Sequence, residues 1–264
     1  MAAAEAQSGG DVSVSLQGVN KTFASGVTAL DRFNLDLKPG EFVSLLGPSG
    51  CGKSTALRLI AGLMEPTRGT VSAPGRSRSG VGQIGFVFQE PTLMPWATVA
   101  GNVGLPLALR RLDGADAAQR VAAALQQVGL DGFEHAYPRE LSGGMKMRAS
   151  IARALVTEPA LLLMDEPFAA LDEVTRFRLN DDLLALWRAV KRTVVFVTHS
   201  VFESVYLSER VVVMTSRPGR VFTELRIDAP VPRDRLFRTS ADYAALCRQV
   251  SEALADATGV EGGA

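Results

Sequence analysis

The sequence predicts an α/β fold with a mostly parallel sheet and an inserted helical subdomain, and three features lead to this prediction. Short, mostly apolar runs at 42–46, 161–164, 194–197 and 211–214 have the length expected of strands buried on both faces. Segments with helical periodicity separate these runs, and strands that alternate with helices form parallel sheets covered on both sides. From about residue 98 to residue 158, by contrast, helical patterns follow one another with few strand signals.

The remaining elements are assigned in chain order. Residues 12–16 and 30–37 alternate apolar and polar side chains, as half-buried strands do. Lys38-Pro39-Gly40 and Arg217-Pro218-Gly219-Arg220 are turn sequences. The expected strands are 12–16, 30–37, 42–46, 69–71, 85–88, 161–164, 194–197 and 211–214, and the expected helices are 53–61, 99–109, 115–128, 143–157, 173–190, 201–207 and 241–255.

Composition excludes several classes of function. The chain has 264 residues, which suits one large domain or a core with an inserted subdomain. Its 28 basic and 28 acidic residues balance, so it lacks the basic excess of a nucleic-acid-binding protein, and we expect no nucleic-acid partner. Two isolated cysteines, Cys51 and Cys247, indicate neither a disulfide framework nor a metal knuckle. We expect no signal peptide and no membrane span, and therefore a cytoplasmic chain that acts at a membrane only through another protein.

A glycine-rich loop between the strand at 42–46 and the following helix carries the first chemical signal. Residues 47–54 fit the phosphate-binding pattern G-x-x-x-x-G-K-[ST]. Glycines let several backbone N–H groups point at one phosphate, the helix N-terminus favours the same anion, Lys53 adds positive charge and Ser54 offers a hydroxyl to Mg²⁺. We expect ATP to contact Gly47, Pro48, Ser49, Gly50, Cys51, Gly52, Lys53, Ser54 and Thr55. The alternative is a chance glycine-rich turn, and Cys51 is either a small filler or a thiol made more acidic by the helix N-terminus.

Two acidic residues follow the buried strand at 161–164. Ending a buried strand in a carboxylate is costly unless a cation meets it, so we expect Asp165 to hold Mg²⁺. Glu166 is then placed to polarise the water that attacks the γ-phosphate. The alternative for Asp165 is a structural one, in which it caps the next helix.

Leu141-Ser142-Gly143-Gly144-Met145, just before a helical segment, makes the pattern more specific. With this motif between the phosphate loop and the acidic strand, the chain resembles the ATP-binding cassette (ABC) family over nearly its whole length. The resemblance implies that Ser142, Gly143 and Gly144 contact the nucleotide held by a second copy of the chain, so that a homodimer encloses two ATP molecules.

Further positions match that family in the expected order. The resemblance implies that Gln89 reaches Mg²⁺ and the attacking water, that Asp172 belongs to the loop after the acidic strand, and that His199 contacts the γ-phosphate. The implied catalytic residues are thus Glu166, His199, Gln89 and Lys53, and the implied metal ligands are Ser54, Gln89 and Asp165. Phe23 is either the aromatic residue that stacks on adenine or an ordinary strand residue.

The resemblance also implies a division of the chain. The fold would be an α/β P-loop NTPase (ABC ATPase) core with a mostly parallel sheet, an N-terminal antiparallel β subdomain and an inserted helical subdomain. The parts would be a disordered tail at 1–10, the core with its antiparallel subdomain at 11–95 and 159–225, the helical signature subdomain at 96–158, and an extension with one helix at 226–264.

Several short segments resemble the nitrate/sulfonate/taurine importer group within the family. They are 90–99, Tyr137-Pro138-Arg139-Glu140, Asp165-Glu166-Pro167-Phe168, Ala170-Leu171-Asp172 and the turn at 217–219. The implied partners are a second copy, transmembrane permease subunits and, indirectly, a solute-binding protein, at the cytoplasmic face of the inner membrane. Trp96 either belongs to the permease-binding groove or packs within the helical subdomain. The alternatives are a lipid-handling or exporter ATPase, or a non-transport cassette that acts on nucleic acid or a cytoplasmic machine.

Overall fold

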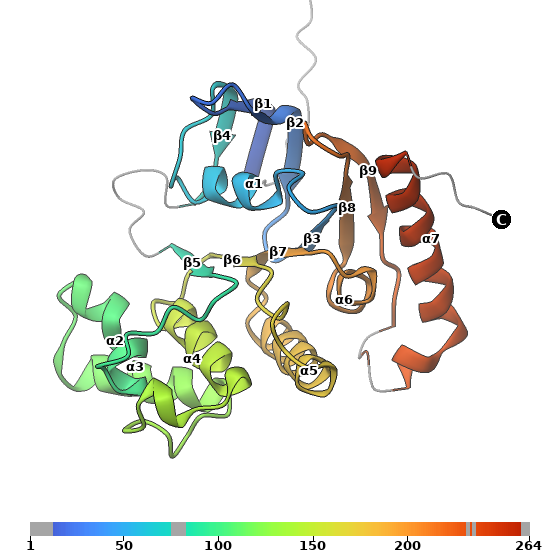
Figure 1. Cartoon of the computed structure of the whole chain (residues 1–264). Helices are drawn as coiled ribbons and strands as arrows, with labels where there is room; N and C mark the ends of the chain where they lie inside the picture. Colours follow the sequence, from blue (N-terminus) through green and yellow to red (C-terminus); the bar gives the residue numbers. More distant parts are fainter. Residues whose placement is uncertain (1–12, 75–82, 231–232, 234–235, 260–264) are drawn as a thin grey trace, which may run out of the picture.

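The computed structural model describes residues 13–74, 83–230, 233 and 236–259 (Figure 1). The tail expected at 1–10 lies outside the described residues. The centre of the molecule is a six-stranded sheet in the order β5-β6-β7-β3-β8-β9, in which all neighbours are parallel except β8 and β9. Its strands are β3 (Phe42–Leu46), β5 (Ile84–Val87), β6 (Leu161–Asp165), β7 (Thr193–Thr198), β8 (Arg210–Met214) and β9 (Val221–Arg226).

A second, antiparallel sheet lies near the N-terminal end of the described chain. Its order is β2-β1-β4, with β1 at Val14–Thr22, β2 at Thr28–Leu37 and β4 at Arg68–Ser72. Helix α1 (Lys53–Ile60) lies between this sheet and the six-stranded one (Figure 1). Buried residues of β1, β2 and α1 form one core with the facing side chains of β3, β6, β7 and β8. This packing fixes the start of α1 at the end of the central strand β3.

The helices between β5 and β6 form a group of their own, separate from α1. Helices α2 (Val99–Leu109), α3 (Gly114–Gln127) and α4 (Gly143–Leu155), with the short helix η1 (Pro138–Glu140), form a separate group in Figure 1. Fully buried Asn102 ties the start of α2 to the preceding loop, because its amide accepts from Met94 N and donates to the carbonyl oxygens of Met94, Ala97 and Thr98.

The other face of the six-stranded sheet carries α5 (Glu173–Val190), α6 (Val201–Leu207) and α7 (Ala241–Thr258), with η2 (Phe237–Thr239) leading into α7. Their buried side chains share a core with those of α2, α3 and α4. Four predicted elements have the expected bounds, namely β3, α2, α5 and α6.

The sequence prediction missed strand β9. It pairs antiparallel with β8, and its side chains alternate between half-buried and exposed. An edge strand of this kind lacks the continuous apolar run that marks the buried strands. Arg226, where the expected extension began, is the last residue of β9. Strand β1 also runs six residues beyond the predicted end, through Gly18, whose positive φ of 56° accompanies a shift in register.

Candidate nucleotide-binding site

The phosphate-binding loop connects the end of β3 to the first residue of α1. Gly50 and Gly52 have φ angles of 75° and 108°, in the left-handed region that favours glycine. A Cβ on Gly52 would lie 2.8 Å from the carbonyl oxygen of Ala29 in β2. The loop therefore requires glycine at this position both for its backbone angles and for its packing.

Lys53 is the buried cation of the loop. Its side chain is 4% exposed, and Nζ donates to the carbonyl oxygens of Gly47 (2.8 Å) and Pro48 (3.0 Å). The same Nζ lies 3.8 Å from Oε1 of Glu166. The structure thus brings the predicted loop lysine and the predicted catalytic acid together from positions 113 residues apart (166 − 53).

Ser54 and Asp165 form the second link between the loop and β6. Ser54 Oγ donates to Asp165 Oδ1 over 2.8 Å. Burial raises the pKa of Asp165 above its usual range, and the hydrogen bond from Ser54 opposes that shift. A hydroxyl beside a carboxylate provides the oxygen ligands that Mg²⁺ prefers, so this pair fits the predicted metal site.

Glu166 follows β6 in a strained conformation, with φ at 46°. Its backbone N–H donates to Val197 O (3.0 Å) in β7, and Oε2 lies 3.3 Å from Nδ1 of His199. The carboxylate of Glu166 therefore lies between Lys53 and His199. These three residues are among the four that the family resemblance implied to be catalytic. His199 itself is 56% exposed.

Glu203 was not recognised from the sequence. It is 8% exposed, its Oε2 accepts from Thr198 Oγ1 over 2.6 Å, and burial raises its pKa. Thr198 Oγ1 also accepts from Ser200 N (3.0 Å), so Glu203 supports the backbone on both sides of His199. Its position four residues after His199 could have marked it as a possible neighbour of the site. Only its burial, however, distinguishes Glu203 from other acidic residues.

The turn after β8 packs directly on the phosphate loop. Arg217 donates from Nε and Nη2 to Gly50 O, over 3.1 Å in each case. A Cβ on Gly219 would lie 2.1 Å from Cys51 O, closer than any non-bonded contact permits. Cys51 is 1% exposed, and burial raises the pKa of its thiol, which supports the filler interpretation over the acidic thiol. The sequence showed the turn but not this contact with the loop.

Two neighbouring helix N-termini carry the other predicted positions. Ser142 caps α4 by accepting from Met145 N (3.3 Å), and Asp172 caps α5 by accepting from Thr175 N (2.9 Å). That hydrogen bond lowers the pKa of Asp172. A Cβ on Gly144 would lie 2.8 Å from Thr175 Cγ2, so the two caps are in close contact. Ser142 and Gly143 are exposed at this surface.

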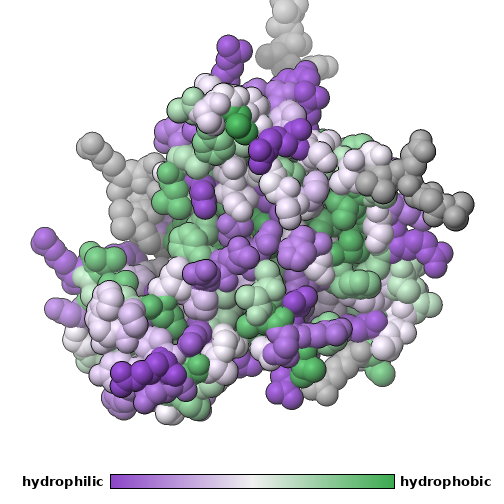
Figure 2. Space-filling model, viewed as in Figure 1, coloured by the Kyte–Doolittle hydropathy of each residue, from purple (hydrophilic) through white to green (hydrophobic). Residues whose placement is uncertain are grey.

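Gln89 and Phe23 lie outside the central cluster of hydrogen bonds and ion pairs. Gln89 is exposed in the loop after β5, and Phe23, 37% exposed, follows β1 with Lys21 Nζ 5.8 Å from its ring centroid. Pro48 and Ser49 lie in the phosphate loop, and Thr55 lies in the first turn of α1. No helix among the described residues is long and apolar enough to cross a membrane, and Figure 2 shows hydrophilic and hydrophobic side chains interspersed over one face of the molecule.

Comparisons with known proteins agree with this geometry. A family model described as "ABC transporter" matches residues 30–169. The chain is 46% identical over 224 residues to the aliphatic sulfonates import ATP-binding protein SsuB of Bacillus subtilis (strain 168), covering 84% of this chain and 86% of that protein. It is 47% identical over 249 residues to the uncharacterized ABC transporter ATP-binding protein MJ0412 of Methanocaldococcus jannaschii, covering 93% and 92%.

Solved structures show the same fold. The dimeric post-hydrolysis structure of the ATP-binding cassette MJ0796 bound to ADP and Pi matches with a TM-score of 0.71 and 35% identity, covering 82% of this chain and all of that one. CbiO1 from Clostridium perfringens, part of the transporter complex CbiONQ, matches with a TM-score of 0.74 and 29% identity, covering 82% and 89%. The phosphate loop, the paired acids and these relatives lead to one conclusion: the chain belongs to the ABC transporter family, as an ATP-hydrolysing cassette.

Proposed function

We propose that this ABC ATP-binding subunit energises the import of a small solute of the sulfonate class through separate membrane subunits. The observation that carries the proposal is its similarity to three proteins named as aliphatic sulfonates import ATP-binding proteins, at 45–49% identity over 81–85% of the chain. Taurine is itself a sulfonate and belongs to this class, whereas nitrate and bicarbonate are the alternative solutes. The subunit would lie at the cytoplasmic face of the inner membrane.

The chemistry assigned to the site follows from its contacts. When ATP binds, the Lys53 ammonium would leave the carbonyl oxygens of its own loop and donate to the β- and γ-phosphates. The phosphate oxygens are stronger hydrogen-bond acceptors than the carbonyl oxygens because they are charged. Ser54 and Asp165, with Gln89, would hold Mg²⁺, which supplies positive charge against the phosphate oxygens when bound. Glu166 would polarise the attacking water, and His199 would hold the γ-phosphate. Phe23 would stack on the adenine ring.

A second copy would complete each site. Helix α4 begins at exposed Gly143 and half-buried Gly144, and its N-terminus is suited to bind an anion. Figure 1 shows α4 and α1 in separate parts of the molecule, so Ser142 and its own Lys53 are poorly placed to grip one nucleotide. A two-fold dimer would bring Ser142 and Asp172 of one copy to the phosphate loop of the other.

We assign permease binding to a groove between β5 and α2. Its volume is about 440 Å³, and apolar lining is supplied by Phe86, Phe88, Leu105 and Leu109. The rings of Phe86 and Phe88 stack at 4.4 Å. Leu109 is 77% exposed and Trp96, in the preceding loop, is 76% exposed, which favours a partner over packing within the subdomain. This groove adjoins the loop that carries Gln89. A permease helix bound in the groove would therefore contact a loop that also reaches the nucleotide site, and movement of that loop would couple the two.

The test of the catalytic assignment is Glu166→Gln, with exposed Glu158→Gln as the matched control. Glu166→Gln is expected to bind ATP with unchanged affinity, to lose at least 100-fold in turnover, and to elute as a dimer in ATP by light scattering. Glu158→Gln should hydrolyse ATP at the normal rate. Undiminished turnover in Glu166→Gln would remove Glu166 from its role.

The solute assignment is tested by growth of the source organism after deletion of the gene that encodes this subunit. Growth on an aliphatic sulfonate as the sole sulfur source is expected to fail, while growth on sulfate continues. The intact gene should restore growth, whereas Glu166→Gln should not. Trp96→Ala should also fail to restore growth although its purified ATPase activity is normal. Undisturbed growth of the deletion strain on sulfonates would assign the subunit to another solute.

A further inference from the structure

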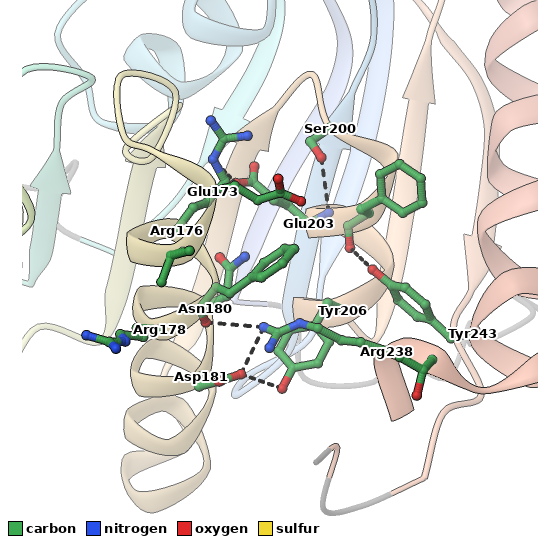
Figure 3. A pocket seen from close by; sticks show the side chains of 14 residues that line it. Glu173, Arg176, Arg178, Asn180, Asp181, Ser200, Glu203, Tyr206, Arg238 and Tyr243 are labelled. Carbon is green, nitrogen blue, oxygen red and sulfur yellow. Dashed lines mark hydrogen bonds and ion pairs between the residues drawn. The ribbon is translucent and has the colours of Figure 1, made fainter. Parts of the chain in front are cut away.

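A buried ion pair joins helix α6 to helix α5 beside the nucleotide site. Glu203 of α6 is 8% exposed, and its Oε1 lies 3.7 Å from Nε of Arg176 in α5 (Figure 3). This distance is too long for a hydrogen bond, and neither of these two buried atoms has a hydrogen-bond partner among the residues that the structure describes. An uncompensated buried charge is costly, so the two charges compensate each other. We call these two residues the α5–α6 pair.

On the α6 side, the pair is connected to the backbone around His199. The other carboxylate oxygen of Glu203, Oε2, accepts from Thr198 Oγ1 over 2.6 Å, and Thr198 Oγ1 in turn accepts from Ser200 N over 3.0 Å. The backbone N–H of Glu203 donates to Ser200 Oγ (3.3 Å). Thr198 and Ser200 are the two neighbours of His199 in the chain. The position of the imidazole therefore depends on the carboxylate of the pair.

On the α5 side, the pair is connected to the loop that carries Asp172. Nη2 of Arg176 donates to Leu171 O (2.9 Å), and the backbone N–H of Arg176 donates to Asp172 O (2.9 Å). Leu171 directly precedes Asp172, whose side chain caps the same helix. The Arg176 guanidinium thus contacts this loop with one nitrogen and faces Glu203 with another. A shift of the loop therefore moves the guanidinium relative to the Glu203 carboxylate.

The hydrogen bonds and the ion pair form one continuous chain of contacts, which consists of Ser200, Thr198, Glu203, Arg176 and Leu171. We infer that the α5–α6 pair positions two loops at once, the loop of His199 and the loop of Asp172. Neither member of the pair is among the residues assigned to ATP or Mg²⁺, so both act through their neighbours. In the proposed dimer, Asp172 faces the nucleotide site of the second copy. Loss of the γ-phosphate at His199 would then be transmitted to that second site.

Histidine NMR on the full chain without nucleotide tests the coupling itself. The chain has two histidines, so His135 serves as an internal control for His199. Arg176→Gln removes one charge of the pair, and we expect it to shift the ring signals of His199 but not those of His135. In a Glu203→Gln background the same substitution should shift His199 by less than half as much, because its effect passes through the carboxylate. Arg178→Gln, at an exposed arginine of the same helix, is the matched control and should shift neither histidine.

ATP turnover tests the consequence of the coupling, which rests on the roles proposed for His199 and Asp172. Arg176→Gln and Glu203→Gln should each lower kcat at least fivefold and change KM for ATP less than twofold, because the phosphate loop is left intact. The double variant should be no slower than the slower single variant, because both substitutions break the same link. Arg178→Gln should keep the normal kcat.

Three results would overturn the inference. They are His199 signals that Arg176→Gln leaves in place, a normal kcat in the single variants, and losses of kcat that multiply in the double variant. If Glu203→Gln fails to fold, the histidine signals and the kcat of Arg176→Gln decide the question. The proposed function fails separately, because normal turnover in His199→Ala would remove the role of His199 without changing the NMR coupling, which needs no nucleotide.

Discussion

Replacing Gly219 by alanine tests whether the turn after β8 shapes the phosphate loop. The new Cβ would lie 2.1 Å from Cys51 O, whereas ordinary contact between these atoms requires about 3.4 Å, so the turn or the loop must move by more than 1 Å. Overpacking of this kind costs about 1–3 kcal/mol. The movement also breaks the two hydrogen bonds from Arg217 to Gly50 O, which together contribute about 1 kcal/mol because Arg217 is exposed.

The total of about 2–4 kcal/mol would lower the midpoint of urea unfolding by roughly 1–2 M. We also expect ATP to bind at least tenfold more weakly, because Gly50 and Cys51 belong to the loop that holds phosphate. The assays are urea unfolding followed by circular dichroism and titration with a fluorescent ATP analogue. Gly101→Ala is the matched control, since its Cβ meets Thr98 Oγ1 at 3.4 Å, an ordinary contact on an exposed helix. If both variants matched the unaltered protein in stability and affinity, the reasoning would be refuted.

Three further predictions follow from buried groups. Burial raises the pKa of Glu203, so this residue favours folding most at pH values below its unfolded pKa. The free energy of unfolding of the unaltered protein, relative to that of Glu203→Gln, should therefore fall as pH rises through the raised pKa, as measured by urea unfolding at several pH values. A difference between the two proteins that does not change with pH would contradict this prediction. Asn102→Ala should lose about 2–4 kcal/mol of unfolding free energy, because four hydrogen bonds of a fully buried side chain disappear; a midpoint within error of the unaltered protein would argue against this. Cys51 should react with iodoacetamide far more slowly in the folded than in the urea-unfolded chain, by peptide mass mapping, because it is 1% exposed and burial raises its pKa; equal rates would show an accessible thiol.

The parts of the fold that the sequence predicted well are those in which local pattern and burial agree. Helix α5 shows this, because it begins at an Asp172 cap and carries a helical pattern to its end at Val190. Strand β9 could not be predicted in the same way, because it is half exposed and exists through its pairing with β8. Helix α7 ends three residues later than expected, at Thr258, and the following Gly259 with φ at 68° was an available stop signal.

The residues of the candidate site also differ in how well the sequence could predict them. The phosphate loop and the acidic pair are contiguous in sequence, so motif and chemistry could identify Lys53 and Glu166. Arg217 acts on Gly50 from 167 residues away, and only the folded chain shows that contact. Glu203 resembles any other helical acid until its burial is known. Contacts between distant segments have no local pattern, and sequence reasoning therefore missed the residues that support the loop and the histidine.

Strand β9 has a consequence for the chain before it meets any partner. An open sheet can recruit strands from other molecules along its two outermost strands. One outermost strand here is β9, whose exposed positions include Glu224 and Arg226, and the other is β5, which has only four residues. Charged side chains on one outermost strand and the shortness of the other discourage intermolecular strand pairing, so newly made subunits should stay dispersed until they assemble.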